Sequence, residues 1–151
     1  RSTLDQLRSE YIETVVMPMI TKKSYALVNK HKKLNDHLLI ITATSSYITK
    51  PIGLLFGIND LIGTDPEEVN GEFTGKVRGI PSFREGKITR LEIWLSEKGL
   101  KMNDFDKTYF YSDSKNDIPL LEKVSNPVAV NADEELMDFA RKRKWPSMNL
   151  R

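Results

Sequence analysis

The sequence predicts an α/β fold with a mainly parallel sheet. Short apolar runs alternate with segments whose apolar residues have helical spacing, a pattern typical of βαβ units. Two of the runs, near 38–46 and 109–111, are expected to be strands, and the second is expected to be buried on both faces of a parallel sheet. Ligands of open α/β sheets bind just beyond the carboxyl ends of strands, so these two ends are candidate sites.

The remaining elements follow from periodicity and from helix-start and turn residues. Helices are expected over residues 2–16, 18–33, 49–56, 87–98 and from 133 onward. Further strands are expected at 61–62 and 128–130. Glycines spread across 70–83 indicate an antiparallel hairpin beside the sheet. One face of the first helix would carry the apolar residues Leu4, Leu7, Tyr11 and Val15.

The stretch Tyr109-Phe-Tyr-Ser-Asp-Ser-Lys-Asn-Asp117 carries the clearest chemical signal. Its aromatic residues favour a strand, and Pro119 followed by apolar residues indicates a helix start, so Asp113 and Asp117 flank a strand-to-helix turn. Two carboxylates this close repel unless one is protonated or a cation such as Mg²⁺ lies between them. The alternative is that Asp113 caps a turn and Asp117 caps the helix, without a metal.

The other strand end has hydroxyl groups instead of carboxylates. The run from residue 38 ends in Thr42-Ala-Thr-Ser-Ser46 and leads toward a helix. Hydroxyls and free amides at a helix entrance bind anions, phosphate above all. The alternative is a Ser/Thr-rich helix cap that binds no ligand. Two polar strand ends in one chain are stronger evidence for a site than either one alone.

Several segments, in this order and spacing, resemble the haloacid dehalogenase-like (HAD) hydrolases, specifically subfamily IB, the phosphoserine phosphatase-like branch. They are Ile-Thr-Ala-Thr-Ser, Gly-Glu-Phe-Thr-Gly-Lys-Val, Phe-Arg-Glu-Gly-Lys-Ile, Tyr-Ser-Asp-Ser-Lys-Asn-Asp-Ile-Pro-Leu-Leu and Pro-Val-Ala-Val-Asn-Ala-Asp-Glu-Glu-Leu. The resemblance runs from about Tyr11 to the end of the chain. It implies a Rossmann-like three-layer core with a mainly parallel sheet and a small β-hairpin, and a helical cap of which most is absent.

The resemblance implies a phosphate-binding role for three residues. Thr42 matches the hydroxyl residue that holds the transferred phosphoryl group, and the amide of Ala43 would assist it. Lys87 matches the lysine that neutralises phosphate charge. Without the resemblance, the sequence around Lys87 would indicate an ordinary exposed lysine.

The same resemblance implies roles for the acidic turn. Asp113 matches the Mg²⁺ ligand, and Asn116 matches the residue that hydrogen-bonds substrate phosphate. Asp117 would orient Lys87 or a metal-bound water, and it is counted with Asp113 among the metal-site residues. Thr42, Lys87, Asp113 and Asp117 would thus form the catalytic set.

The nucleophile of the family is an aspartate in an Asp-x-Asp-x-Thr motif at the end of the first strand, and it forms an aspartyl-phosphate that water hydrolyses. The pattern occurs here as Asp104-Phe-Asp-Lys-Thr108, but residues 98–103 before it do not read as a buried strand. We therefore expect a surface connection there, with the true nucleophile missing from this chain. A receiver-like phosphoacceptor domain is disfavoured because its acidic pair belongs early in the chain, whereas Asp113 is late.

The implied organisation is a residual cap or linker helix at 1–16 and a core lacking its first strand at 17–151. The intact protein would be a Mg²⁺-dependent phosphomonoester hydrolase acting on a small, phosphoserine-like metabolite, and this chain alone would be inactive. The competing hypothesis is a non-catalytic module that binds Mg²⁺ or phosphate and serves as a partner or regulatory domain.

Composition agrees with a cytoplasmic globular domain. The 151 residues are 39% hydrophobic, enough for one core, and the absence of cysteine excludes disulfides and thiolate metal sites. No apolar run approaches the roughly 18 residues that span a membrane. The net charge is +2, and the basic cluster 141–144 is expected to be a solvated helix end. We expect a small phosphorylated substrate and, as partner, the missing amino-terminal segment or a second copy, with no nucleic acid and no membrane.

Overall fold

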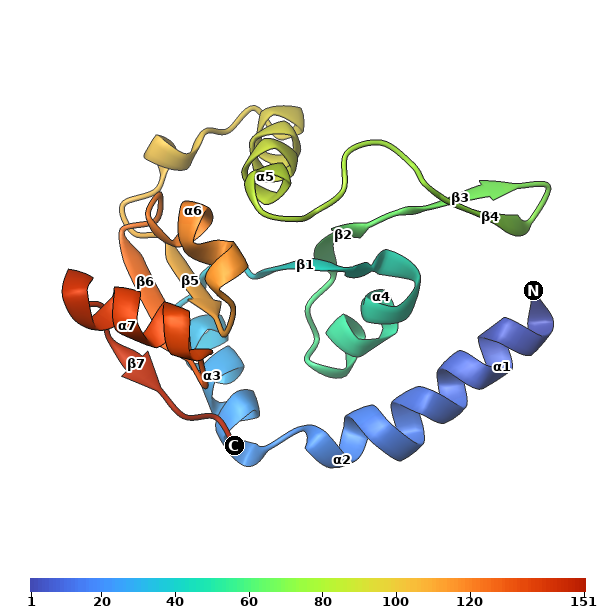
Figure 1. Ribbon diagram of the computed structural model, residues 1–151, viewed down its shortest axis with the longest axis horizontal. Coiled ribbons are helices and arrows are strands. Elements are labelled where there is room, and N and C mark those ends of the chain that lie inside the picture. Colours follow the sequence, from blue (N-terminus) through green and yellow to red (C-terminus); the bar gives the residue numbers. More distant parts are fainter. The chain divides into compact units, whose positions relative to one another are not determined.

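The computed structural model describes all 151 residues, which divide into an amino-terminal unit, residues 1–82, and a carboxy-terminal unit, residues 83–151 (Figure 1). The amino-terminal unit contains α1 (Ser2–Tyr11), the π-helical turn η1 (Ile12–Val16), α2 (Met17–Met19), α3 (Lys22–Lys33), β1 (Leu39–Ser45), α4 (Ser46–Leu55), β2 (Asp60–Thr64), β3 (Pro66–Val69) and β4 (Glu72–Val77). The carboxy-terminal unit contains α5 (Glu85–Glu97), the 3₁₀ turn η2 (Met102–Asp104), β5 (Tyr109–Ser112), the 3₁₀ turn η3 (Lys115–Asp117), α6 (Ile118–Leu121), β6 (Asn126–Val130), α7 (Glu134–Arg143) and β7 (Ser147–Met148).

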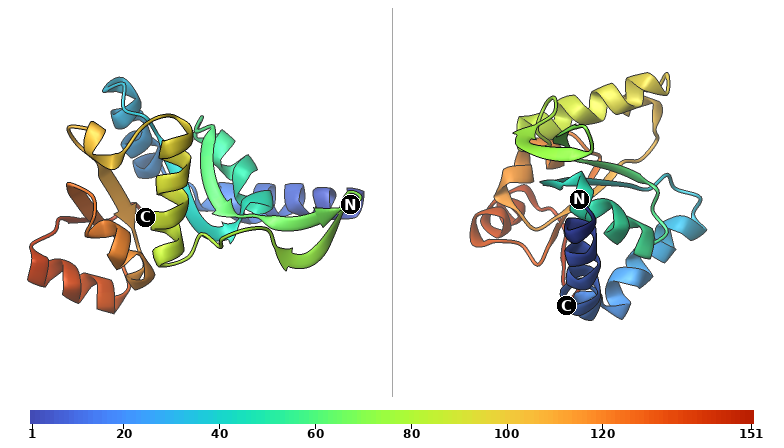
Figure 2. Two further views of the ribbon diagram at one scale, coloured as in Figure 1. Left: turned by 90° about the horizontal axis from the view of Figure 1, so that it is seen from above. Right: turned by 90° about the vertical axis from the view of Figure 1, so that its right-hand side faces the viewer.

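Most strands pair in parallel, which confirms the predicted α/β class. In the amino-terminal unit β1 pairs with β2, and in the carboxy-terminal unit the order is β5-β6-β7, all parallel. The antiparallel exception is the β3–β4 hairpin, a two-stranded ribbon in Figure 2. Each of the two predicted strand ends, that of β1 and that of β5, therefore belongs to a strand paired in parallel within its own unit.

The hairpin exists as predicted, but the range expected for it, 70–83, was wrong. Its strands span 66–77, and Asn70 and Gly71 form the turn with φ of 52° and 80°. These are the residue types that adopt positive φ most readily. Gly79, which the sequence suggested as part of the hairpin, lies beyond its second strand.

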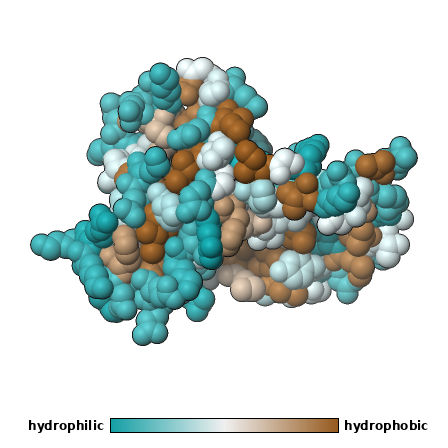
Figure 3. Space-filling model, turned by 45° about the horizontal axis from the view of Figure 1, so that its top comes forward, coloured by the Kyte–Doolittle hydropathy of each residue, from teal (hydrophilic) through white to brown (hydrophobic).

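The first predicted helix forms, and it continues through η1 and α2 to Met19. A new helix then begins because Thr21 and Ser24 form a capping box, with Thr21 Oγ1 accepting from the Ser24 amide at 3.2 Å. The apolar face of the first helix is not buried, since all four of its residues are exposed by more than two fifths: Leu4, Leu7, Tyr11 and Val15. Hydrophobic side chains reach the surface elsewhere too, as Figure 3 illustrates for one face. The domain boundary expected after residue 16 remains a prediction.

The carboxy-terminal unit has a hydrophobic core whose fully buried residues come from strand β6 and helices α6 and α7. Its fully buried members are Leu121, Ala129, Leu136 and Ala140, with Phe110, Ile118 and Trp145 packed around them. This core fixes β5 and β6 beneath α6 and α7, and so fixes the loop that follows β5. No helix of the chain combines the length and the apolar character needed to span a membrane.

Candidate active site

The turn after β5 contains a buried ion pair. Lys87 Nζ, from the first turn of α5, donates to Asp117 Oδ1 at 2.6 Å, and Ser112 Oγ donates to Asp117 Oδ2 at 2.5 Å. Lys87, Asp117 and Ser112 are each at most 7% exposed. Both Asp117 oxygens are therefore engaged, and the carboxylate is held between the end of β5 and the start of α5.

This geometry contradicts two of the alternatives that the sequence left open. Lys87 is not an exposed lysine, because only 6% of its surface reaches solvent. Asp117 occupies the position before α6 but makes no side-chain capping bond, and Ser114 Oγ caps the preceding 3₁₀ turn by accepting from the Asn116 amide at 3.2 Å. The two aspartates are therefore not a pair of caps.

Asp113 differs from Asp117 in exposure and in partners. Its side chain is exposed at the carboxyl end of β5 and forms no hydrogen bond or ion pair with the chain. Its carbonyl accepts from the amide of Asp133 at 2.9 Å. Asp133 also accepts from the Leu136 amide and the Lys115 amide, at 2.8 Å each, so one carboxylate joins the start of α7 to the turn that carries Asp113.

The residues present fit a Mg²⁺ ion that keeps most of its water. No group of three or more carboxylate, histidine or cysteine side chains converges as a metal cage. Mg²⁺ in phosphoryl-transfer sites, however, commonly takes only one or two carboxylates and completes its shell with water and substrate oxygens. The free carboxylate of Asp113 suits that chemistry, whereas the oxygens of Asp117 already accept from Lys87 and Ser112.

Asn116 lies on the same turn and has a partner that the sequence did not reveal. Arg84 Nε donates to Asn116 Oδ1 at 3.3 Å, across 32 positions of sequence. Arg84 adopts φ of 50° and ψ of −124°, outside the usual regions for a residue with a side chain. No local sequence pattern indicates this bond, because Asn116 lies in a different segment of the chain.

In the amino-terminal unit, the predicted phosphate-binding residues lie in an irregular stretch of β1. The β1–β2 register runs Ile41↔Ile62 and then Ser45↔Thr64, so residues 42–44 face only Gly63. Bulges of this kind turn side chains and amides out of the ladder and are common next to active sites. Thr42 is half-buried, Ala43 is exposed, and Thr42 Oγ1 accepts from the Thr44 amide at 3.1 Å.

The alternative in which these hydroxyls cap the following helix is not supported. Helix α4 begins at Ser46, three residues earlier than the sequence suggested, and Ser45 at its N-cap makes no side-chain capping bond. Ser46 Oγ instead donates to Asp65 Oδ1 at 2.6 Å. The hydroxyl and amide groups of residues 42–44 thus remain the anion-binding candidates of this unit.

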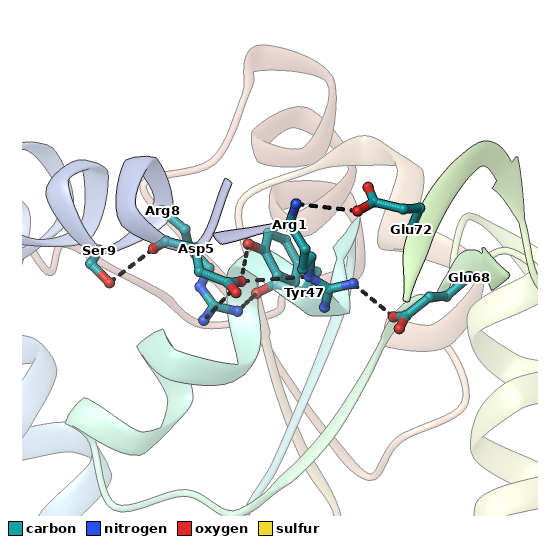
Figure 4. A network of polar contacts seen from close by, with 7 residues as sticks. All are labelled: Arg1, Asp5, Arg8, Ser9, Tyr47, Glu68 and Glu72. Atoms are coloured by element: carbon teal, nitrogen blue, oxygen red, sulfur yellow. Dashed lines mark hydrogen bonds and ion pairs between the residues drawn. The ribbon is translucent and has the colours of Figure 1, made fainter. Parts of the chain in front are cut away.

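A polar network around Tyr47 connects α1 to the start of α4 and to the hairpin (Figure 4). The Tyr47 hydroxyl donates to Asp5 Oδ1 at 2.5 Å, and this bond lowers the pKa of Asp5, with Arg1 and Arg8 adding to the effect. Loss of hydration around the hydroxyl and the same bond raise the pKa of Tyr47. The Tyr47 ring also packs edge-on against Phe73, with centroids 4.9 Å apart.

Arg8 supplies a hydrogen bond that the helix itself cannot make. Pro51 lies inside α4 and has no N–H, so the carbonyl of Tyr47, four residues earlier, lacks its helical donor. Arg8 Nη1 donates to this carbonyl at 3.1 Å, and the guanidinium lies 4.2 Å from the centre of the Tyr47 ring. A residue of α1 therefore completes the hydrogen bonding of the helix that follows β1.

The predicted site residues fall into two groups. In the carboxy-terminal unit, Lys87 and Asp117 are in direct contact, with Asp113 and Asn116 on the adjoining turn. Thr42 and Ala43 belong to the amino-terminal unit. The Asp-x-Asp-x-Thr pattern at 104–108 begins in η2 and precedes β5, so it lies at the opposite end of that strand from Asp113. Asp104 there accepts from the Lys101 amide at 2.7 Å, as expected of a surface turn.

Comparison with known proteins gives matches over most of the chain. A family model described as haloacid dehalogenase-like hydrolase matches residues 2–122. A histidinol-phosphatase of Neisseria meningitidis serogroup C (strain 8013) is 43% identical over 100% of this chain and 68% of its own length. A phosphoserine phosphatase of Mycobacterium tuberculosis (strain ATCC 25618 / H37Rv) is 30% identical over 96% of this chain, but only 46% of its own length is covered.

A solved structure also matches almost the whole chain. A protein of unknown function from Bordetella pertussis Tohama I is 41% identical to this chain and superposes with a TM-score of 0.97. The match covers 99% of this chain and 67% of the other. The chain thus spans between about half and two thirds of the proteins to which it is similar.

Proposed function

This chain belongs to the haloacid dehalogenase-like hydrolase family, and from that membership we propose that it is the phosphate- and metal-binding part of a Mg²⁺-dependent phosphomonoester hydrolase. The observation that carries the proposal is the buried Lys87–Asp117 pair, next to the free carboxylate of Asp113 at a strand end. A buried, oriented cation beside a free carboxylate is what charge stabilisation of a phosphoryl group requires.

In the proposed mechanism, each residue here handles charge or position. Asp117 holds the ammonium of Lys87 in place, and the remaining N–H groups of Lys87 would bind phosphoryl oxygens. In the amino-terminal unit, the hydroxyl of Thr42 and the amide of Ala43 would bind phosphoryl oxygens. Asp113 would hold Mg²⁺, which when bound withdraws charge from the phosphoryl oxygens.

The covalent step would use an aspartate outside this chain. Its carboxylate oxygen would form a bond to phosphorus as the P–O ester bond breaks, and the leaving oxygen would take a proton from the second aspartate of the same Asp-x-Asp-x-Thr motif. Water, giving a proton back to that aspartate, would then hydrolyse the aspartyl-phosphate to inorganic phosphate and the free carboxylate. We place no part of this step on the motif at 104–108, because it lies at the opposite end of β5 from Asp113.

We propose a small phosphomonoester of an amino alcohol as substrate. Histidinol phosphate and phosphoserine, the compounds implied by the names of two relatives, both combine a phosphate ester with an amine. Amine-bearing phosphate esters are a narrower class of substrate than phosphate esters in general, and this class includes both histidinol phosphate and phosphoserine.

The test is a phosphatase assay on the full-length protein that contains this chain, with Mg²⁺ and with phosphoserine, histidinol phosphate and p-nitrophenyl phosphate in parallel. Thr42→Ala, Lys87→Ala and Asp113→Asn should each lower kcat by about a hundredfold or more. Asp104→Asn removes the first carboxylate of the Asp-x-Asp-x-Thr pattern at 104–108. It is the matched control and should retain activity. A full-length protein inactive on all three esters that still binds Mg²⁺ and phosphate would favour the non-catalytic module instead.

A further inference from the structure

The side chain of Asn116 is held by a single hydrogen bond, and that bond determines which end of the amide is free. Arg84 Nε donates to Oδ1 at 3.3 Å, and no other group of the chain bonds to the side chain. A carboxamide accepts through its oxygen and donates through its amino group. With the oxygen engaged by Arg84, the amino group is left as a donor, which is the end that an anion needs.

We propose that Arg84 is a positioning residue that orients the Asn116 carboxamide to donate a hydrogen bond to a phosphoryl oxygen of the substrate. The inference rests on the proposed function, since it assumes that the turn after β5 receives a phosphate ester. It adds Arg84 to the residues of the proposed site and gives its side chain a role, which neither the sequence nor the comparisons indicated.

Arg84 suits this role because its own position is restrained. Its carbonyl accepts from the Lys87 amide at 3.1 Å, which ties it to the first turn of α5. Its guanidinium lies 5.0 Å from the centre of the Phe83 ring. The Asn116 backbone is restrained as well, by the bond from its amide to Ser114 Oγ. Donor and acceptor are therefore both anchored before any ligand arrives.

The orientation matters because the two ends of the amide have opposite effects on an anion. In the observed orientation the amino group can donate to a phosphoryl oxygen, whereas a flipped amide would present lone pairs to it. Lys87 does not hold the amide, since its ammonium bonds to Asp117 at 2.6 Å and the Asn116 side chain bonds only to Arg84. Without Arg84 both orientations would be populated, and part of the binding energy would be spent in selecting one.

The experiment is a titration of the ¹⁵N-labelled chain with inorganic phosphate in the presence of Mg²⁺, followed through the Asn116 side-chain amide signals. Arg84→Gly is the chosen truncation, because glycine accepts a φ of 50° and removes the side chain without adding strain. Asn116→Ala and the double variant complete a cycle. Arg141→Ala removes a positive charge from the same unit at an exposed ion pair and serves as the control.

We expect Arg84→Gly to weaken phosphate binding about twofold or more, because at most about half of the Asn116 side chains would then present the amino group. Asn116→Ala should weaken it about five- to tenfold, the effect of one well-made hydrogen bond. The double variant should be no weaker than Asn116→Ala alone, because Arg84 acts through Asn116. Before phosphate is added, the two Asn116 amide protons should already shift in Arg84→Gly. The control should bind like the wild-type chain.

Three results would overturn the inference. Wild-type affinity in Arg84→Gly would show that the orienting bond has no effect. A loss in the double variant clearly beyond that of Asn116→Ala would show that Arg84 acts through its own charge. A wild-type chain that binds no phosphate with Mg²⁺ would count against the proposed function itself, and the inference would fail with it.

Discussion

Lys87 Nζ and Asp117 Oδ1 lie 2.6 Å apart, and each side chain is only 8% exposed, although the two residues are 30 positions apart in the sequence. Removing one member of a buried pair leaves the other charge without its partner, which typically costs about 3–5 kcal/mol. We therefore expect Lys87→Met to lower the free energy of unfolding by an amount in that range, measured by urea denaturation.

The exposed Arg143–Glu122 pair offers a matched control for this prediction. Its atoms are 3.3 Å apart and its side chains are 54% and 40% exposed, so Arg143→Met should cost less than about 1 kcal/mol. Equal costs for Lys87→Met and Arg143→Met would mean that the Lys87–Asp117 pair is solvated and does not anchor the site.

Gly63 is required by the close approach of β2 to the start of α4. A Cβ on this residue would lie 2.9 Å from Ser46 Cα and 3.0 Å from the Ser46 nitrogen, which are backbone atoms that cannot rotate away. We expect Gly63→Ala to destabilise the protein by about 1–3 kcal/mol. Backbone amide shifts should change most over residues 42–46, since Gly63 faces the bulge there. Unchanged stability and unchanged shifts in this variant would show that the two segments separate easily.

The sequence was sufficient for features that depend on neighbouring residues. Apolar runs located β1 and β5, and Asp133 was correctly expected to begin the last helix, where its side chain accepts from the Leu136 amide. The hairpin was misplaced because several glycines in 70–83 were potential turn residues, and only Asn70-Gly71 forms the turn. Local patterns therefore gave the elements but not all of their limits.

Long-range partners could not be predicted from the same patterns. Nothing in Glu-Gly-Lys-Ile indicates that Lys87 is buried, because its partner lies in a different segment. The bond from Arg84 to Asn116 and the bulge opposite Gly63 likewise depend on which strands and helices become neighbours. The roles of these residues in chemistry remain predictions until they are tested.

The contribution of the Tyr47–Asp5 hydrogen bond to stability should fall at both low and high pH. The pKa of Asp5 is lowered on folding, so its contribution to stability is present above the ordinary carboxyl pKa near 4 and is lost as the pH falls through the lower folded value. The pKa of Tyr47 is raised, so its contribution is present below about pH 10 and is lost as the pH rises through the higher folded value.

Tyr47→Phe removes the hydroxyl and should move the pKa of Asp5 up toward its ordinary value, because the bond from Tyr47 is the largest cause of the shift. An NMR titration of the Asp5 carboxyl carbon between pH 2 and roughly 7 would measure the change. Tyr25→Phe is the control, since Tyr25 contacts Phe56 by its ring and has no hydrogen bond to a carboxylate. The same Asp5 midpoint in all three proteins would assign the shift to Arg1 and Arg8.

Arg8 and Pro51 give a prediction in which a second substitution repairs the first. Arg8→Met should leave the Tyr47 carbonyl without a donor and destabilise the protein by about 1–3 kcal/mol. Pro51→Ala supplies the missing N–H at the position where α4 can use it, so the double variant should recover much of the loss. Urea denaturation of the four proteins measures the coupling. If Pro51→Ala stabilises both backgrounds equally, the two residues are not coupled, and Arg8 acts through its packing on the Tyr47 ring rather than through the carbonyl.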